Sequence, residues 1–422
     1  MLERRRPIPV EEAVERVIGY KKQGETEKVL ILEAYGRTLG EDVAATHHVP
    51  PFDRSPYDGF AIRAQDSSNA SSEEPVHFKV IEEIGAGSVA KNIPGPYEAI
   101  RIMTGAQLPE GCDAVVMLEL AKEYNKENQS YISIKRSYQP GDNVSFTGED
   151  TKKGTVLLKK GESINPGAIA LLATFGYECI SVAKKPSVAI FATGTELLDV
   201  GEELKPGKIR NSNAYMLYAQ IIRAGGKPFM LGKLPDHLET CYEAIKNASE
   251  NFDMIITTGG VSVGDYDYMP DVYKKLGAEV LFNKVAMRPG SVTTAAVKGD
   301  ILLYGLSGNP SACFVGFELF VKPVIKSRLF SEKPHLLKLQ ATLTEDFPKP
   351  NPFTRFIRSA LSIEGDRVKV TPSGFDKSSA VSSLAASDSF IMLPGGTRGF
   401  QKGDTVDVLI HEGLEGDVWP WS

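Results

Sequence analysis

The sequence predicts a multidomain protein that combines an α/β domain with regions built mainly of β-strands. Between residues 186 and 329, short apolar runs alternate with amphipathic helical patterns, as in a parallel sheet covered by helices. Residues 76–136 and 330–422 instead hold short alternating strands separated by glycine and proline. A chain of 422 residues is long enough for about two to four such domains.

Composition excludes several classes of partner. Charged residues make up 24% of the chain and the formal net charge is -6, which does not favour nucleic acid or an anionic membrane. No apolar run approaches the roughly 18 residues of a membrane span, and no apolar stretch follows the basic residues 4–6. The four cysteines have no paired spacing and are typical of reduced thiols. We therefore expect a cytoplasmic protein.

The first part of the chain contains a helix, a stiff loop and a β-rich insertion. Residues 8–23 carry one apolar face at helical spacing. Three prolines within residues 49–61 indicate a rigid loop rather than a helix or a central strand. Strands are expected at 76–84, 100–103, 114–118 and 131–134, and a helix at 165–176.

The α/β region has four expected strands whose ends are polar or small. These strands cover residues 188–192, 229–234, 254–256 and 301–304, and the helices between and after them cover 212–223, 237–249, 269–276 and 311–322. Right-handed crossovers would bring the four strand ends to one edge of a doubly wound sheet. The sequence therefore predicts a ligand site at that edge, although glycines that serve only an ordinary βα turn remain the alternative.

Acidic residues gather at these strand ends. They are Glu196, Asp236, Asp265 and Asp267. Carboxylates at one edge repel each other unless a cation relieves them, and Mg²⁺ shared with a substrate phosphate is the usual arrangement. Lys284 and Arg288 would supply positive charge from one face of a strand, with a solvated charged face as the alternative.

Six segments in this order resemble one family over essentially the whole chain. They are PPFDRSPYDGFAIR, IRIMTGAQLPEGCDAVV, GED at 148–150, ATGTEL, TTGGVSVGDYDY and GLSGNPSA. These segments are similar to those of the MoeA molybdopterin molybdenumtransferases, which are related to the gephyrin E domain. The resemblance implies a homodimer that inserts molybdate into adenylylated molybdopterin with release of AMP, and that requires Mg²⁺. A molybdopterin adenylyltransferase and a non-catalytic scaffold of the gephyrin type are the alternatives.

The resemblance also implies four domains and their partners. The connecting domain would cover 27–46 and 148–185, and a small all-β insertion domain 47–147. The α/β molybdopterin-binding domain would cover 8–26 and 186–329, and a C-terminal β-barrel 330–422, where the strand pattern itself fits a barrel or a sandwich. The molybdopterin adenylyltransferase and apo-molybdoenzymes are expected as further partners.

Site residues follow from the resemblance position by position. The catalytic set is Asp58, Thr104, Glu196, Asp236, Asp267, Lys284 and Arg288, of which Glu196, Asp236 and Asp267 would hold the metal. Substrate would contact Asp150, Thr193, Gly194, Gly259, Gly260, Ser262, Ser307, Gly308, Asn309 and Pro310. Molybdate would meet Arg288, Ser291, Arg358 and Ser383. Here the sequence departs from the family, whose common Lys-Pro-Gly-Lys-Pro appears as Arg-Pro-Gly-Ser-Val at 288–292, so that one of the two cations is lost.

Overall fold

The computed structural model describes residues 6–20, 22–235, 237–260 and 269–413, which form two compact units. The first unit contains the chain up to Glu41, the short segment Lys160–Asn165 and everything from Cys179 onward. The second contains Asp42–Lys159 and Pro166–Glu178. This division splits the expected connecting domain between the two units, and the four-domain boundaries stay a prediction. No helix of the described part of the chain is long and apolar enough to cross a membrane.

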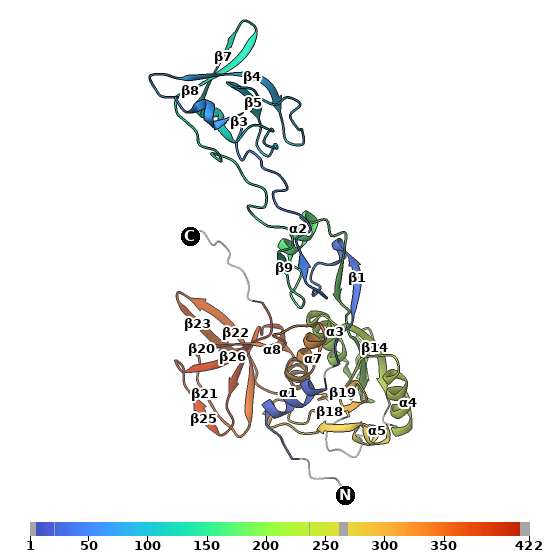
Figure 1. Ribbon diagram of the computed structural model, residues 1–422. Coiled ribbons are helices and arrows are strands. Elements are labelled where there is room, and N and C mark those ends of the chain that lie inside the picture. Colours follow the sequence, from blue (N-terminus) through green and yellow to red (C-terminus); the bar gives the residue numbers. More distant parts are fainter. Residues whose placement is uncertain (1–5, 21, 236, 261–268, 414–422) are drawn as a thin grey trace. The chain divides into compact units, whose positions relative to one another are not determined.

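The first unit contains the doubly wound sheet that the sequence predicts (Figure 1). Its strand order is β14 (Lys227–Leu234), β11 (Ser187–Thr193), β15 (Met254–Thr258), β19 (Ile301–Leu306), β18 (Thr294–Lys298) and β16 (Glu279–Phe282). The first four strands pair in parallel, whereas β18 pairs antiparallel with both of its neighbours, β19 and β16. From β11 the chain turns first to β14 on one side and then to β15 on the other, so the topological switch point lies between β11 and β15.

Helices cover both faces of this sheet because its strands are apolar on both faces. On one face Ile190 and Ile256 pack with residues of α1 (Val10–Gly19), α3 (Ser212–Ala224), α6 (Pro310–Gly316) and α7 (Lys322–Arg328). On the other face Ala189 and Ile255 pack with residues of α4 (Leu238–Ser249) and α5 (Met269–Lys275) (Figure 1). The helix expected at 311–322 extends to Arg328, with a π-helical turn at Phe317–Val321 between α6 and α7.

The C-terminal region is a closed barrel, which decides between the two folds that its strand pattern allowed. Around the barrel the strands are β22 (Thr354–Glu364), β23 (Arg367–Pro372), β20 (Leu337–Leu343), β26 (Thr405–Ile410) and β24 (Ser389–Leu393), and β24 pairs with β22 to close it. The short β17 (Met287–Arg288) pairs in parallel with β22, which places Arg288 opposite Arg355. The antiparallel pair of β21 (Phe347–Asn351) and β25 (Thr397–Phe400) and the short α8 (Ser382–Ala385) complete this region.

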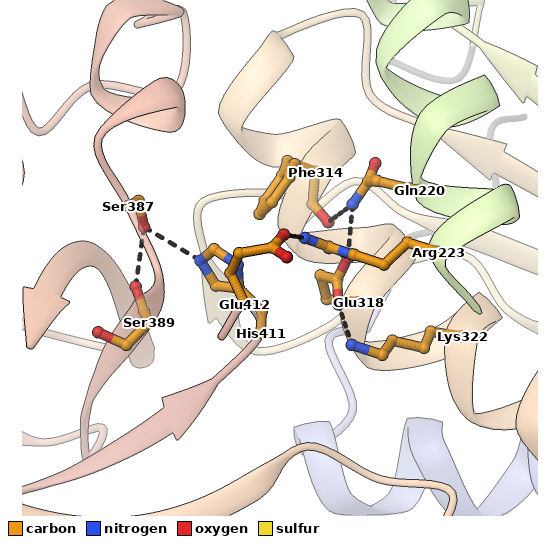
Figure 2. A network of polar contacts seen from close by, with 9 residues as sticks. All are labelled: Gln220, Arg223, Phe314, Glu318, Lys322, Ser387, Ser389, His411 and Glu412. Atoms are coloured by element: carbon orange, nitrogen blue, oxygen red, sulfur yellow. Dashed lines mark hydrogen bonds and ion pairs between the residues drawn. The ribbon is translucent and has the colours of Figure 1, made fainter. Parts of the chain in front are cut away.

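A buried ionic network connects the barrel to the α/β sheet within the first unit (Figure 2). Glu318, in the π-helical turn, is fully buried and pairs with Arg223 of α3 and with Lys322 at 2.9 Å. Arg223 also pairs with Glu412, two residues after the end of β26, as Figure 2 shows. Because a buried charge needs fixed partners, this network holds the end of the barrel strand at α3.

The second unit is built on a six-stranded sheet. Its order is β6 (Ala114–Met117), β3 (Gly59–Ile62), β5 (Glu98–Ile102), β4 (Val76–Ile84), β8 (Gln129–Ile134) and β7 (Ala121–Lys126). The expectation of a loop throughout 49–61 is therefore wrong at its end, because β3 is a central strand. The prolines all precede Gly59, and a Cβ at Gly59 would lie 2.0 Å from the carbonyl oxygen of Val116, so the close pairing needs glycine.

The remaining elements are short. The second unit also contains α2 (Pro166–Thr174) and the pair β2 (Val43–Ala44) with β9 (Val156–Leu158). In the first unit β1 (Thr26–Leu30) pairs with β10 (Cys179–Ala183), and β12 (Leu197–Leu198) with β13 (Ile209–Arg210). Single 3₁₀ turns cover Ile31–Glu33, Ala64–Ser67 and Leu118–Leu120.

Candidate functional site

The switch point between β11 and β15 is shaped by glycines that the sequence analysis singled out. The hydroxyl of Thr193, at the end of β11, donates to the carbonyl oxygen of Thr258 at 3.0 Å. Gly259 follows at a φ of 85°, and a Cβ there would lie 2.7 Å from the carbonyl oxygen of Thr193. Glycine is needed at this place for both its backbone conformation and the close approach of two strand ends. The alternative that these glycines serve the geometry of the turn is thus correct in part, but the same glycines also line a cavity.

A cavity of about 650 Å³ opens at this edge of the sheet and gathers eight of the predicted residues. They are Thr193, Gly194, Glu196, Gly259, Gly260, Gly308, Asn309 and Pro310. The start of α3 adds Asn211, Ser212 and Asn213, which the sequence analysis missed. The Asn213 amide donates to the carbonyl oxygen of Gly308 at 2.9 Å and so ties α3 to the turn after β19.

A second cavity, of about 680 Å³, adjoins the first and shares Glu196, Ile209, Gly259, Gly260, Gly308 and Asn309 with it. Ser307, Arg288, Ser291 and Arg358, all predicted, line it. Arg355, Asp376, Lys377 and Ser378 line it as well and were not predicted. Its charged lining residues are four cations and two carboxylates, which gives a net charge of +2 among the described residues. Arg355 and Lys377 add positive charge to a pocket in which the sequence has Ser291 instead of lysine.

Arg358 of β22 is the most enclosed charged group in this wall, with 1% of the residue exposed. Its Nε donates to the Ser383 hydroxyl at 3.1 Å, and its Nη2 donates to the carbonyl oxygen of Phe375 at 2.9 Å. Burial lowers the pKa of Arg358, and the nearby Asp376 carboxylate opposes that shift. Ser383 itself lies outside both cavity linings as described, and it acts on the site by fixing Arg358.

Other predicted residues are not brought to these cavities by the described part of the structure. Lys284 is half-buried and lines neither cavity, and the strand expected to carry it together with Arg288 is reduced to Met287–Arg288. The expectation of one shared strand face is therefore wrong. Near Lys284 the backbone is instead held by Ile8, whose N–H donates to the Lys284 carbonyl oxygen at 3.2 Å.

Three predicted residues belong to the second unit. The backbone N–H and the hydroxyl of Thr104 both donate to Asp58 Oδ1 at 2.7 Å. These two hydrogen bonds hold the pKa of the Asp58 carboxyl below its ordinary value. Asp58 and Thr104 therefore form one polar pair, and their catalytic role stays a prediction. Asp150 lies in the same unit and accepts a hydrogen bond from the Thr151 hydroxyl at 3.2 Å.

The predicted metal site lies partly outside the described residues. Asp236, Asp267, Ser262 and Asp265 are in the segments that the structure does not describe. Glu196 is described and lines both cavities. Among the described residues no three His, Cys, Asp or Glu side chains lie close enough together to bind a metal ion. The magnesium ligands therefore stay a prediction.

Comparisons with known proteins agree with this architecture along the chain. Residues 8–176 match the MoeA N-terminal region (domain I and II), residues 189–327 a probable molybdopterin binding domain, and residues 340–410 the MoeA C-terminal region (domain IV). A molybdopterin molybdenumtransferase of Bacillus subtilis is 59% identical over all of this chain and 98% of its own length. One from Staphylococcus aureus is 50% identical over 98% of this chain and 97% of its own.

A solved structure shows the same fold over nearly the full length. The molybdopterin biosynthesis MoeA protein from Pyrococcus horikosii aligns with a TM-score of 0.85 and 33% identity, and covers 97% of this chain and 100% of its own. The matched regions include the switch-point sheet, the barrel and the residues of both cavities. This chain therefore belongs to the MoeA family of molybdopterin molybdenumtransferases, and it is a transferase of molybdenum cofactor biosynthesis.

Proposed function

We propose that this chain inserts molybdate into adenylylated molybdopterin and releases AMP. The observation that carries the proposal is the pair of adjoining cavities at the switch point. One is bordered by loop glycines and small polar residues, and the other has a net positive lining. The first suits a ligand with phosphate groups, and the second suits an oxyanion. Because they share lining residues, the two substrates would meet at Glu196 and the Gly259 loop.

The phosphates of the adenylylated pterin would lie against the loop after β15 and the turn Ser307–Pro310. Backbone N–H groups of glycine-rich loops can approach and donate to phosphate oxygens. Ser262 of the same sequence motif is proposed as a further contact. Molybdate carries two negative charges and would dock against Arg288, Arg358 and the Ser291 hydroxyl, with Ser383 holding the Arg358 fork in place. Molybdenum would then bind the two pterin sulfurs and lose one oxo group as water, while one water would cleave the phosphoanhydride, so that the pterin keeps its phosphate and AMP leaves.

Glu196, Asp236 and Asp267 are proposed to hold Mg²⁺. When bound, Mg²⁺ would neutralise the pyrophosphate and stabilise the leaving phosphate. Lys284 would balance anionic charge. We also propose that the chain forms a homodimer, and that Asp58, Thr104 and Asp150 act in the cleft of the partner protomer. We also place the reaction in the cytoplasm, with an adenylyltransferase supplying the pterin and apo-molybdoenzymes receiving the cofactor.

The test measures AMP released from purified adenylylated molybdopterin, with and without molybdate and with and without Mg²⁺. The wild-type chain should need both. Asp267→Ala should abolish AMP release while leaving the protein folded by circular dichroism, because it removes a proposed metal ligand. Wild-type turnover in that variant, or AMP release independent of molybdate, would refute the proposal. Formation of adenylylated pterin from ATP and molybdopterin would instead support an adenylyltransferase, and binding without turnover would support a scaffold.

A further inference from the structure

Asp376 places a carboxylate among the cations of the oxyanion cavity. Its Oδ1 lies 3.7 Å from Arg358 Nη1, and its Oδ2 lies 3.9 Å from Arg355 Nη1 and 3.5 Å from Lys349 Nζ. The side chains of Asp376 and Arg355 are 14% and 13% exposed, and that of Arg358 is 1% exposed. The protein thus places its own anion beside Arg358, against which molybdate is proposed to dock, and beside Arg355 of the same cavity wall.

This carboxylate offsets part of the positive charge of the two arginines but forms no hydrogen bond with their Nη1 groups. Arg358 Nη1, Arg355 Nη1 and Asp376 Oδ2 are buried, and none has a hydrogen-bond partner among the described residues. The other donors of Arg358 are fixed by Ser383 and by the carbonyl oxygens of Phe375 and Lys377. Burying a hydrogen-bond donor without a partner costs free energy. The two Nη1 groups would therefore gain from donating to an anion that lies closer than Asp376 does.

We propose that Asp376 is an internal exchange anion, which yields the two arginines to the arriving oxyanion and returns to them when the oxyanion leaves. This role rests on the proposed function. A transferase must release its cargo, and two arginines stripped of any anion in a buried wall would oppose that release. Asp376 keeps one negative charge beside the two arginines both before binding and after transfer. Its cost is a lower affinity, because every oxyanion must first displace the same carboxylate.

The test is titration of the full chain with molybdate and with perrhenate, tetrahedral oxyanions of similar shape that carry two charges and one. Asp376→Asn should tighten the binding of both anions by the same factor, of about tenfold, since both displace one carboxylate. If the carboxylate instead stayed in place and only repelled the ligand, the repulsion energy would be twice as large for molybdate as for perrhenate. The factor by which Asp376→Asn tightens molybdate binding would then be about the square of the factor for perrhenate. Unequal gains of that kind, or unchanged or weaker binding, would overturn the proposal.

Three further variants make the outcome specific. Asp376→Ser should repeat the gain with a smaller side chain, and Asp376→Glu should bind as the wild type does because it keeps the carboxylate. Asp407→Asn is the matched control, since it removes another carboxylate of the barrel, which pairs with Lys338 at 3.4 Å and lies outside both cavity linings as described. Its anion affinity should be unchanged. Thermal unfolding of each variant without anion shows whether the fold is intact.

Turnover separates exchange from simple binding. In Asp376→Asn the KM for molybdate should fall and kcat should fall as well, because no carboxylate replaces the departing oxyanion. Unchanged kcat with a lower KM would refute the exchange step. The titrations use anions alone, so they can support or refute displacement even if the chain proves not to transfer molybdenum to the pterin.

Discussion

At Gly259 a single added carbon would disturb both the fold and the candidate site. Its φ of 85° is left-handed, and a Cβ would lie 2.7 Å from a backbone oxygen of Thr193, which cannot move aside as a flexible side chain could. We expect Gly259→Ala to lower the free energy of unfolding by about 3 kcal/mol, from the left-handed backbone together with the clash. Urea unfolding measures this, and under the proposed function the KM for adenylylated molybdopterin should rise in the same variant.

Gly277 provides the matched control for this substitution. It has a φ of 67°, and a Cβ there would meet no atom within 4 Å. Gly277→Ala should therefore cost only the backbone strain, about 1 kcal/mol, and should leave the KM unchanged. Equal losses in the two variants would show that the close approach to Thr193 contributes nothing.

Single residues also show where sequence reasoning reached its limit. Arg358 was predicted from the family resemblance, whereas Arg355 and Asp376 were missed although they line the same cavity. Strand β22, which carries both arginines, shows no alternation, because Phe356 packs into the core of the α/β sheet and the adjacent Ile357 into the barrel. A strand buried on both sides loses the period-two signal.

At the scale of elements, the parallel strands and their helices could be predicted because each has a continuous apolar run or a clear apolar face. The helix that ends at Arg328 was predicted too short, since Pro323 reads as a stop. In the structure Pro323 lies in the first turn of α7, directly after the π-helical turn, where its missing N–H costs little. The pairing of β17 with β22 joins distant segments, which no local pattern encodes.

The π-helical turn holds a charge whose loss we expect to be costly. Glu318→Gln would leave Arg223 and Lys322 without their buried carboxylate partner. Removing one partner of a buried pair should lower the free energy of unfolding by about 3 kcal/mol. Urea unfolding at pH 7 measures the change. Glu25→Gln, which breaks the exposed pair with Lys184 at 2.8 Å, should have no measurable effect, and a similar loss in both variants would contradict the argument.

At the scale of the whole molecule, each compact unit contains hydrophobic cores of its own among the described residues. In the second unit Phe60 and Ile100 belong to cores made only of residues from that unit. The cores of the first unit contain residues of the α/β sheet and of the barrel, such as Ile256 and Phe390. A change that acts on one core should therefore shift the unfolding transition of the unit that contains it and leave the transition of the other unit unchanged.

His411 offers such a change through pH. It is buried against Phe314 and Phe390, and burial, followed by the nearby Arg223 and Lys322, lowers its pKa from 6.5 to about 3. The folded first unit holds this ring neutral, whereas the unfolded chain binds a proton below pH 6.5, so stability falls as pH decreases from there toward 3. The loss from this group approaches about 1.4 kcal/mol per pH unit. In urea unfolding between pH 7 and pH 4, His411→Phe, which keeps an aromatic ring but cannot titrate, should remove that slope from the first unit only. The control is His335→Phe at an exposed histidine, which should retain the pH dependence of stability. An unchanged pH dependence in His411→Phe would show that the folded protein does not hold this ring neutral.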